Sequence, residues 1–110
     1  MAAPKNEKFS KEQIEIAKIA KVISHPARIE IIKTLAEKNM CICGEIVDLV
    51  PLSQSTVSQH LKELKEVGLI KGTIDGVKSC YCIDWTQFEE KINLLTEYFN
   101  KLKGHKIKCC

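Results

Sequence analysis

The chain has 110 residues, of which 45% are hydrophobic and 28% are charged, and its net charge at pH 7 is +3. This length predicts one domain with a modest core, and the sequence has no run of about 18 apolar residues that could cross a membrane. We therefore expect a cytoplasmic protein without a membrane partner. Because a charge of +3 is too small to indicate a nucleic-acid partner, the positions of the lysines have to decide that question.

Two amphipathic helices are predicted in the first third of the chain. Residues 1–9 lack the apolar segment of a secretory signal and are predicted to be a disordered lead-in. Ser10 and Gln13 have the spacing of a capping box, which predicts a helix over 10–24. A proline at a first-turn position predicts a second helix over 26–38. The apolar residues of this second helix that are expected to face the core are Ile29, Ile32 and Leu35.

The segment from Ser53 to Gly68 is the most informative part of the chain. A short extended piece over 40–42 and a helix over 44–50 are expected to precede it. Ser53 is a typical N-cap residue and Gly68 a typical left-handed residue after a helix, so a further helix is predicted between them. Apolar residues recur along it at four- and three-residue steps and form one stripe that must pack on a core. They are Val57, Leu61 and Leu64.

The other face of this predicted helix is short and polar. Ser, Thr and Gln are poor choices for a merely solvated helical face, whereas small hydrogen-bonding side chains can approach base edges and phosphates. This composition favours sequence-specific DNA binding over an ordinary amphipathic surface helix. The residues predicted to contact DNA are Gln54, Ser55, Thr56, Ser58, Gln59, His60 and Lys62. For His60, a packing role is the alternative.

Two β-prone runs, over 69–74 and 77–83, follow this helix. Asp75 and Gly76 between them form a strong two-residue hairpin signal. Such a turn fixes the register of the two strands. The cross-strand pairs that it predicts are Ile74 with Val77, Ile70 with Tyr81, and Lys71 with Cys80.

Alternation along the hairpin gives it one apolar and one polar face. The apolar face is expected to carry Ile70, Ile74, Val77, Tyr81 and Ile83. The other face is expected to carry Lys71, Thr73, Lys78, Cys80 and Cys82. Lysines on this face suit a wing that touches phosphate, with Lys78 as a predicted DNA contact. The alternative is a hairpin that only closes the core.

A last helix is predicted after the hairpin, capped by Asp84 or Thr86. Its apolar stripe repeats at four- and three-residue steps and is wider than one small domain needs, which favours a homodimer. The stripe consists of Phe88, Ile92, Leu94, Leu95, Tyr98, Phe99 and Leu102. The expected fold is mainly α with a small β-hairpin: a winged helix-turn-helix domain over 10–103, dimerised through its first and last helices. A basic tail over 104–110 follows it.

Four segments together resemble the ArsR/SmtB family of bacterial winged-helix repressors, over roughly residues 12–100. They are His25–Arg28, Leu52–Leu61, Glu66–Leu69 and the end of the wing, Tyr81–Ile83. The resemblance implies a homodimer that binds an operator palindrome near a promoter and is released by a soft metal or metalloid, or by oxidants. Two recognition helices would then reach half-sites about one helical turn apart.

Six cysteines occur as three pairs, and in a cytosolic chain reactive or metal-binding thiols are favoured over disulfide staples. The pairs are Cys41 with Cys43, Cys80 with Cys82, and Cys109 with Cys110. In the family that the chain resembles, arsenic and cadmium sensors often carry a Cys-x-Cys pair before the recognition helix. Here the first pair falls one residue earlier, so that binding mode cannot simply be carried over. As alternatives, the first pair could be small buried hydrophobes and the tail pair could be inert.

A site at the wing is expected instead. In winged-helix domains the strand around 40–42 pairs with the second wing strand, which would bring a cysteine of the first pair alongside Cys80 and Cys82. Lys71 opposite Cys80 would favour the Cys80 thiolate. An all-sulfur cluster suits As(III), Sb(III) or Cu(I), and Zn(II) or Cd(II) if it is tetrahedral. We favour As(III), because arsenite prefers three thiolates and because the tail pair resembles arrangements in other arsenic-responsive members of the family.

The leading hypothesis is therefore a homodimeric repressor that As(III) releases from a palindromic operator. A thiol redox or persulfide sensor of the same fold is the alternative. An enzyme is not expected, because there is no Cys-x-x-Cys, βαβ pattern or Gly-rich phosphate loop. A zinc sensor of the family would place Asp, His and Glu ligands along the last helix, but all three histidines lie outside it. They are His25, His60 and His105.

Overall fold

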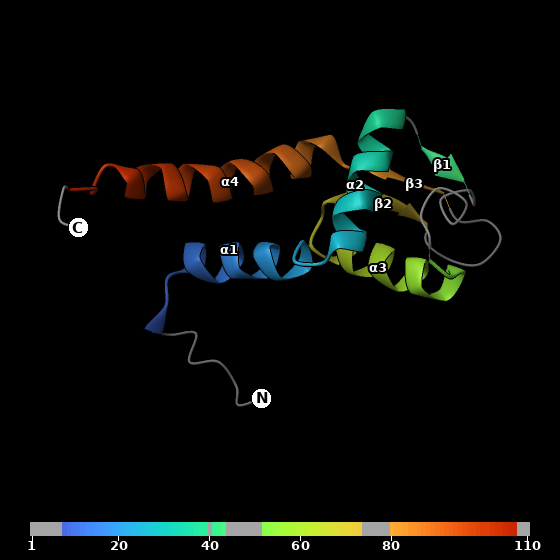
Figure 1. The fold of residues 1–110 in the computed structure, drawn as a ribbon, viewed down its shortest axis with the longest axis horizontal. Helices are drawn as coiled ribbons and strands as arrows, with labels where there is room; N and C mark the ends of the chain where they lie inside the picture. The colour runs from blue at the N-terminus through green and yellow to red at the C-terminus, as the bar shows by residue number, and fades with distance from the viewer. Residues whose placement is uncertain (1–7, 40, 44–51, 74–79, 108–110) are drawn as a thin grey trace.

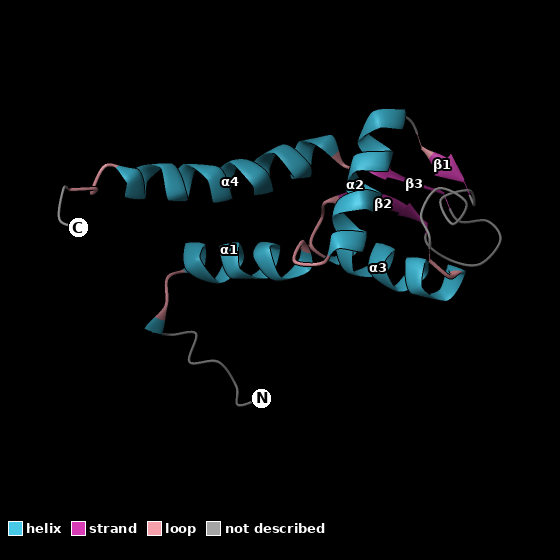
Figure 2. Cartoon of the chain, viewed as in Figure 1, coloured by secondary structure: helices cyan, strands magenta, loops and turns pink. Residues whose placement is uncertain are grey.

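The computed structural model describes residues 8–39, 41–43, 52–73 and 80–107. Its elements are α1 (Lys11–Val22), α2 (Pro26–Lys38), β1 (Ile42–Cys43), α3 (Gln54–Glu66), β2 (Ile70–Thr73), β3 (Cys80–Ile83) and α4 (Trp85–Lys103). These four helices confirm the predicted ones in order and position (Figure 2). Most of the expected lead-in, the helix over 44–50, the hairpin turn with Ile74, Val77 and Lys78, and the two tail cysteines lie outside the described residues.

Local capping explains where the helices begin and end. The Ser10 hydroxyl accepts a hydrogen bond from the backbone N–H of Gln13 at 3.0 Å, and the Gln13 side chain accepts one from the backbone N–H of Ser10 at 3.1 Å, which confirms the capping box. Asn39 ends α2 with a φ of 50°. Gly68 follows α3 with a φ of 89°, and a Cβ at this position would overlap the Gln87 side chain. Both stops occupy the left-handed region, which glycine and asparagine tolerate best.

The core-facing side of α2 differs from the expected one. Ile31 and Leu35 are 0% and 1% exposed, whereas Ile29, which was expected to face the core, is 50% exposed. Ile32 packs only at the edge of the core. Closely spaced isoleucines allow two apolar stripes on a helix of 3.6 residues per turn, and packing against α3 and β3 selects the stripe through Ile31 and Leu35.

The three strands form one antiparallel sheet in the order β1-β3-β2. The pairs between β2 and β3 are Ile70 with Ile83, Lys71 with Cys82, Gly72 with Tyr81, and Thr73 with Cys80. The expected pairs, Ile70 with Tyr81 and Lys71 with Cys80, are wrong by two residues. Six residues separate the paired Thr73 and Cys80. In the register of a two-residue turn, only four residues would separate Thr73 from its partner. Because the shift is even, each side chain keeps its predicted face.

The core lies where α2, α3 and the inner face of the sheet meet. The stripe of the predicted recognition helix is buried as expected, with Val57, Leu61 and Leu64 at most 2% exposed. The apolar face of the hairpin covers the opposite side of this core. The buried residues that α2 and the sheet contribute are Ile31, Leu35, Ile42, Leu69, Ile70, Tyr81 and Ile83.

Helices α1 and α4 lie side by side and extend away from this core (Figure 1). The Lys91 ammonium of α4 pairs with the Glu15 carboxylate of α1 at 2.7 Å, and the hydrogen bond between them lowers the pKa of Glu15. The radius of gyration is 16.5 Å, against about 13 Å for a compact domain of this length. No residue of α4 is fully buried. None of the helices that the structure describes combines the length and apolar character needed to cross a membrane.

Candidate DNA interface and cysteine cluster

The N-terminal half of α3 presents a row of hydroxyl and amide groups on the surface. The Ser53 hydroxyl accepts a hydrogen bond from the backbone N–H of Thr56 and lies 2.9 Å from the Thr56 hydroxyl and 3.3 Å from that of Ser55. A helix N-terminus carries free N–H groups and a partial positive charge, which suits a phosphate. Of the predicted DNA contacts with described side chains, the exposed ones are Ser55, Thr56, Gln59 and Lys62, and Ser58 is half-buried.

His60 differs from the other residues predicted to contact DNA. Its side chain is 7% exposed and packs against α2. The Nδ1 atom of His60 accepts a hydrogen bond from Nε of Arg28 at 2.9 Å, and its ring lies 4.6 Å from that of His25. Its packing role is therefore confirmed, and we remove it from the set that faces DNA. His60 directly follows the polar residues of α3, which is why the sequence grouped it with the DNA contacts. Its burial depends on α2, which is distant in sequence.

The wing is described only in part. On β2, Lys71 is exposed beside the edge of the sheet, as the alternating pattern predicts. The predicted phosphate contact Lys78 lies outside the described residues. Strand β2 begins a few residues after the C-terminal end of α3. A lysine on its outer face is therefore close in sequence to the proposed recognition helix.

Strands β1 and β3 bring the two Cys-x-Cys pairs together. Ile42 pairs with Tyr81 and Cys43 pairs with Cys80. Ile42 and Tyr81 are 6% and 2% exposed and point into the core. Because side chains alternate along a strand, Cys80 and Cys82 belong to the outer face of β3. The pairing of this strand with the second wing strand is confirmed, and its register places Cys41 at the level of Cys82.

The thiols of this cluster are not equivalent. Burial raises the pKa of the Cys82 thiol, a hydrogen bond with Cys41 raises it further, and the Lys71 ammonium acts in the opposite direction. Cys41 and Cys82 are free cysteines, exposed and half-buried respectively. Cys80 takes part in a disulfide bond. The lysine therefore lies opposite Cys82, not opposite Cys80 as expected, which follows from the shifted register.

Binding of a metal ion through Cys80 would require this cysteine in its reduced form, whereas the structure has it in a disulfide bond. Among the side chains that the structure describes, no three His, Cys, Asp or Glu residues are grouped to hold a metal ion. The side chain of Cys43 and both tail cysteines are outside that set. Cys80 could act as a ligand only after reduction of its disulfide, because a disulfide sulfur carries no thiolate to donate.

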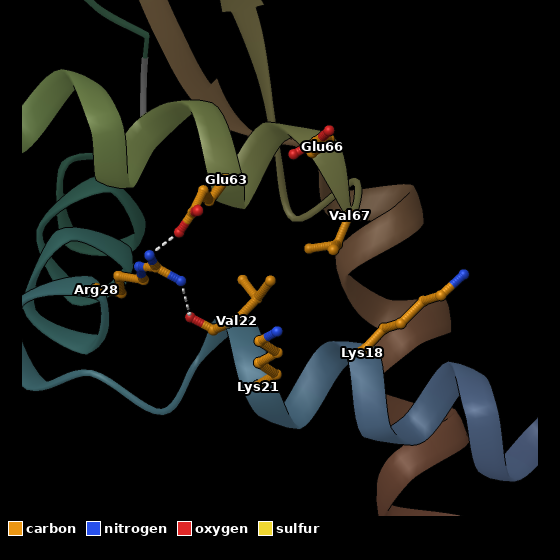
Figure 3. A pocket seen from close by; sticks show the side chains of 7 residues that line it. All are labelled: Lys18, Lys21, Val22, Arg28, Glu63, Glu66 and Val67. Atoms are coloured by element: carbon orange, nitrogen blue, oxygen red, sulfur yellow. Dashed lines mark hydrogen bonds and ion pairs between the residues drawn. The ribbon is translucent and has the colours of Figure 1, made fainter. Parts of the chain in front are cut away.

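Sequence reasoning gave Arg28 no role of its own, although its neighbourhood contributed to the family resemblance. Its guanidinium contacts the Glu63 carboxylate of α3 and the Val22 carbonyl of α1 (Figure 3). It also contacts His60 of α3. A signal was present: Arg28 is the only arginine in a chain with many lysines. Arginine is preferred over lysine where a planar fork must reach several acceptors at once.

Helix α3 has a polar exposed face, packs on α2 and is followed by two antiparallel wing strands, which is the arrangement of a winged helix-turn-helix DNA-binding regulator. Residues 25–71 match the family model described as bacterial regulatory protein, arsR family. The chain is 38% identical over 82 residues to an uncharacterized HTH-type transcriptional regulator of Methanocaldococcus jannaschii, an alignment that covers 74% of this chain and 91% of that protein. It is 31% identical to an arsenical resistance operon repressor of Staphylococcus xylosus, over 78% and 81% of the two chains.

Solved structures support the same conclusion. An ArsR-like transcriptional regulator from Rhodococcus has the same fold, with a TM-score of 0.67 at 18% identity, over 86% of this chain and 88% of that chain. The transcriptional repressor BigR from Xylella fastidiosa aligns with a TM-score of 0.59 at 25% identity, over 94% and 99% of the two chains. The chain therefore belongs to the ArsR/SmtB family of winged-helix transcriptional repressors, and it is a DNA-binding regulator and not an enzyme.

Proposed function

We propose that this protein is a homodimeric repressor that binds a palindromic operator and is released when As(III) binds cysteine thiolates at the β1–β3 edge. The observation that carries the proposal is the register in which Cys43 pairs with Cys80, with Ile42 and Tyr81 buried on the other face. This register brings the two Cys-x-Cys segments together on neighbouring strands.

The arrangement of α1 and α4 supports a homodimer. These helices project from the core, and the apolar side chains of α4 are partly or largely accessible in a single chain, Phe99 and Leu102 at 48% each. A second copy packed on this surface would remove that apolar area from water. Two copies of α3 would then be held at a fixed separation, as two half-sites one helical turn apart require.

Operator contacts are assigned to the exposed end of α3 and to the wing. Ser55, Thr56 and Gln59 offer hydrogen bonds to bases and phosphates, and Lys62 offers a charge to the backbone. Gln54 belongs to the same proposed set by its place at the start of the helix. Lys71 and Lys78 are the proposed phosphate contacts of the wing.

The chemistry of the cluster favours a soft metalloid. Thiolates select soft ions, and As(III) or Sb(III) bound by three of Cys41, Cys43, Cys80 and Cys82 would tie β1 to the second wing strand. This would change the wing relative to α3 and so shift the dimer away from its DNA-binding geometry. Cys109 and Cys110 remain proposed as alternative ligands from the tail. One relative is named an arsenical resistance operon repressor.

A second candidate is a thiol redox sensor, which the disulfide bond at Cys80 favours. In this case two thiols lose two electrons and two protons to an oxidant such as a peroxide, and a disulfide forms. A persulfide donor would transfer its outer sulfur to one thiol and leave as a thiol itself, after which the second thiol would form the disulfide and displace that sulfur as hydrogen sulfide. The free pair Cys41 and Cys82 would add a second thiol couple on the same face.

Operator release separates these candidates. Reduced protein is bound to a fluorescent duplex selected from a random DNA pool and titrated separately with arsenite, cadmium, zinc and hydrogen peroxide. Release by arsenite in the wild type, lost in a Cys80→Ser/Cys82→Ser variant that still binds the duplex, supports the metalloid proposal. Release by peroxide alone supports the redox sensor instead. A Cys109→Ser/Cys110→Ser variant is the matched control, and loss of its arsenite response would move the site to the tail.

A further inference from the structure

Arg28 connects three helices through one guanidinium group (Figure 3). Its Nη1 donates a hydrogen bond to the Val22 carbonyl at the end of α1 at 3.0 Å. Its Nε donates to Nδ1 of His60 at 2.9 Å, and its Nη2 pairs with the Glu63 carboxylate. The Arg28 side chain is only 14% exposed, so these contacts are shielded from water. The two contacts to α3 lie three residues apart, about one turn, along the helix.

The contacts that Arg28 makes with α1 and α3 border a pocket and are not surrounded by dense packing. A pocket of about 400 Å³ lies between the ends of α1 and α3. Its lining residues are Lys18, Lys21, Val22, Arg28, Glu63, Glu66 and Val67. Because side chains do not fill this space, the position of α3 relative to α1 depends on the polar contacts of Arg28 more than it would in a closely packed interface.

Two histidines complete the arrangement. The Nδ1 atom of His25 accepts a hydrogen bond from the backbone N–H of Ala27 at 3.0 Å, so its ring caps α2. The Nδ1 atom of His60 accepts from Arg28, and the two rings lie 4.6 Å apart at 55°. A histidine nitrogen accepts a hydrogen bond only when it carries no proton. Arginine stays charged and can only donate, so a proton on Nδ1 of His60 is incompatible with this contact.

We propose that Arg28 is a positioning residue for the recognition helix α3, and that protonation of His60 releases α3 from it and so lowers operator affinity. The proposal rests on the DNA-contacting role of α3. The groups that face His60 are Arg28 and His25 from α2, with Glu63 one turn further along α3. A proton on His60 places a second cation against Arg28 and leaves only Glu63 to hold the guanidinium on α3.

The surroundings of His60 shift its pKa in the direction that keeps the ring neutral and able to accept the hydrogen bond from Arg28. Burial lowers the pKa of His60, and the charge of Arg28 and the neighbouring His25 lower it further. A group whose folded pKa is lowered contributes stability that is complete above its unfolded value and is lost as the pH falls through the folded value. The contact between Arg28 and His60 is therefore intact at neutral pH and is lost as the pH falls through the lowered pKa of His60.

The test measures duplex affinity from about pH 8 to about pH 5.5, which spans the titration range of histidine. His60→Asn is the key variant, because its Oδ1 can replace Nδ1 as an acceptor and does not titrate. We expect wild-type affinity to fall about tenfold over this range and that of His60→Asn to stay constant. His105→Asn, which changes an exposed histidine, should follow the wild type. Equal pH dependence in His60→Asn and wild type overturns the proposal, as does a flat wild-type profile.

Two further measurements keep the proposal testable if His60→Asn does not fold. Arg28→Lys keeps the charge but cannot reach all three acceptors, so its affinity at about pH 8 should be about tenfold lower than that of the wild type. Unchanged affinity in this variant overturns the positioning role. Imidazole NMR of the DNA-free protein should show the Nε2–H tautomer of His60, with a protonation midpoint that matches the loss of affinity, and a mismatch overturns the proposal. The NMR result stands even if the protein fails to bind DNA, which would count against the proposed function alone.

Discussion

Lys71 of β2 lies directly across the sheet from Cys82 of β3. Burial raises the pKa of the Cys82 thiol, as does the hydrogen bond with Cys41, while the charge of Lys71 lowers it. The charge of Lys71 therefore offsets only part of the effect of burial and of Cys41, and the pKa of the Cys82 thiol stays above its ordinary value. Since only the thiolate attacks electrophiles and binds soft ions, this pair couples the wing to the reactivity of the cluster.

Replacing Lys71 by Met should make Cys82 less reactive. Removal of the positive charge raises the pKa of the thiol, so the alkylation rate of reduced protein at about pH 7.5 should fall about two- to threefold, and the rate profile should move to higher pH. Peptide-level mass spectrometry after timed iodoacetamide treatment measures Cys82 alone. Lys103→Met, at the far end of α4, is the control. An unchanged Cys82 profile would show that Lys71 does not act on this thiol.

Gln59→Ala should weaken operator binding without lowering thermal stability. The side chain is exposed on α3, and one bidentate contact to a base is worth about 1–3 kcal/mol, or roughly a tenfold or greater loss of affinity. Fluorescence anisotropy and a melting curve give the two quantities. Glu37→Ala, at an exposed position on α2, should change neither. Normal affinity of Gln59→Ala would remove this residue from the proposed interface.

Gly68→Ala should destabilise the fold. Alanine at a φ of 89° is strained, and its Cβ would overlap the Gln87 side chain. We expect a loss of about 1–3 kcal/mol in the free energy of unfolding, measured by urea denaturation. Gly104→Ala is a matched control, because Gly104 has a φ of −66° and an added Cβ would approach only the Lys101 carbonyl, at 3.3 Å. Equal stability of the two variants would contradict the strained turn after α3.

Phe99→Glu should break the proposed homodimer. A charge in the apolar stripe of α4 would be buried without a partner in a dimer, so sedimentation equilibrium should show a monomer, and operator affinity should fall by about two orders of magnitude as the second half-site contact is lost. Asn100→Glu adds the same charge on the neighbouring residue and should remain dimeric. A dimeric Phe99→Glu variant would place the interface elsewhere.

The signals that predicted the fold correctly were local. The capping box at Ser10 and Gln13, the stop at Gly68 and the apolar stripe of α3 depend on residues a few positions apart, so backbone hydrogen bonding and side-chain period are enough to specify them. The alternating faces of the hairpin were also correct, because face depends only on even or odd position. The polar character of the exposed α3 face likewise follows from composition alone.

The errors arose where distant segments meet. The side of α2 that enters the core, through Ile31 and not Ile29, was selected by packing against α3 and β3, because periodicity left two stripes open. The register that sets Lys71 opposite Cys82 depended on the length of the connection and not on its turn residues. His60 was assigned to DNA because nothing near it in sequence reveals that α2 covers it.

The sequence by itself determined helix α3, the two wing strands and the spacing of the cysteines, since each depends on short-range pattern. Only the tertiary structure decided which groups meet: Cys43 with Cys80, Lys71 with Cys82, and Arg28 with His60. These contacts join residues that are far apart along the chain. Their geometry follows from how the helices and the sheet pack around one core, which no local pattern encodes.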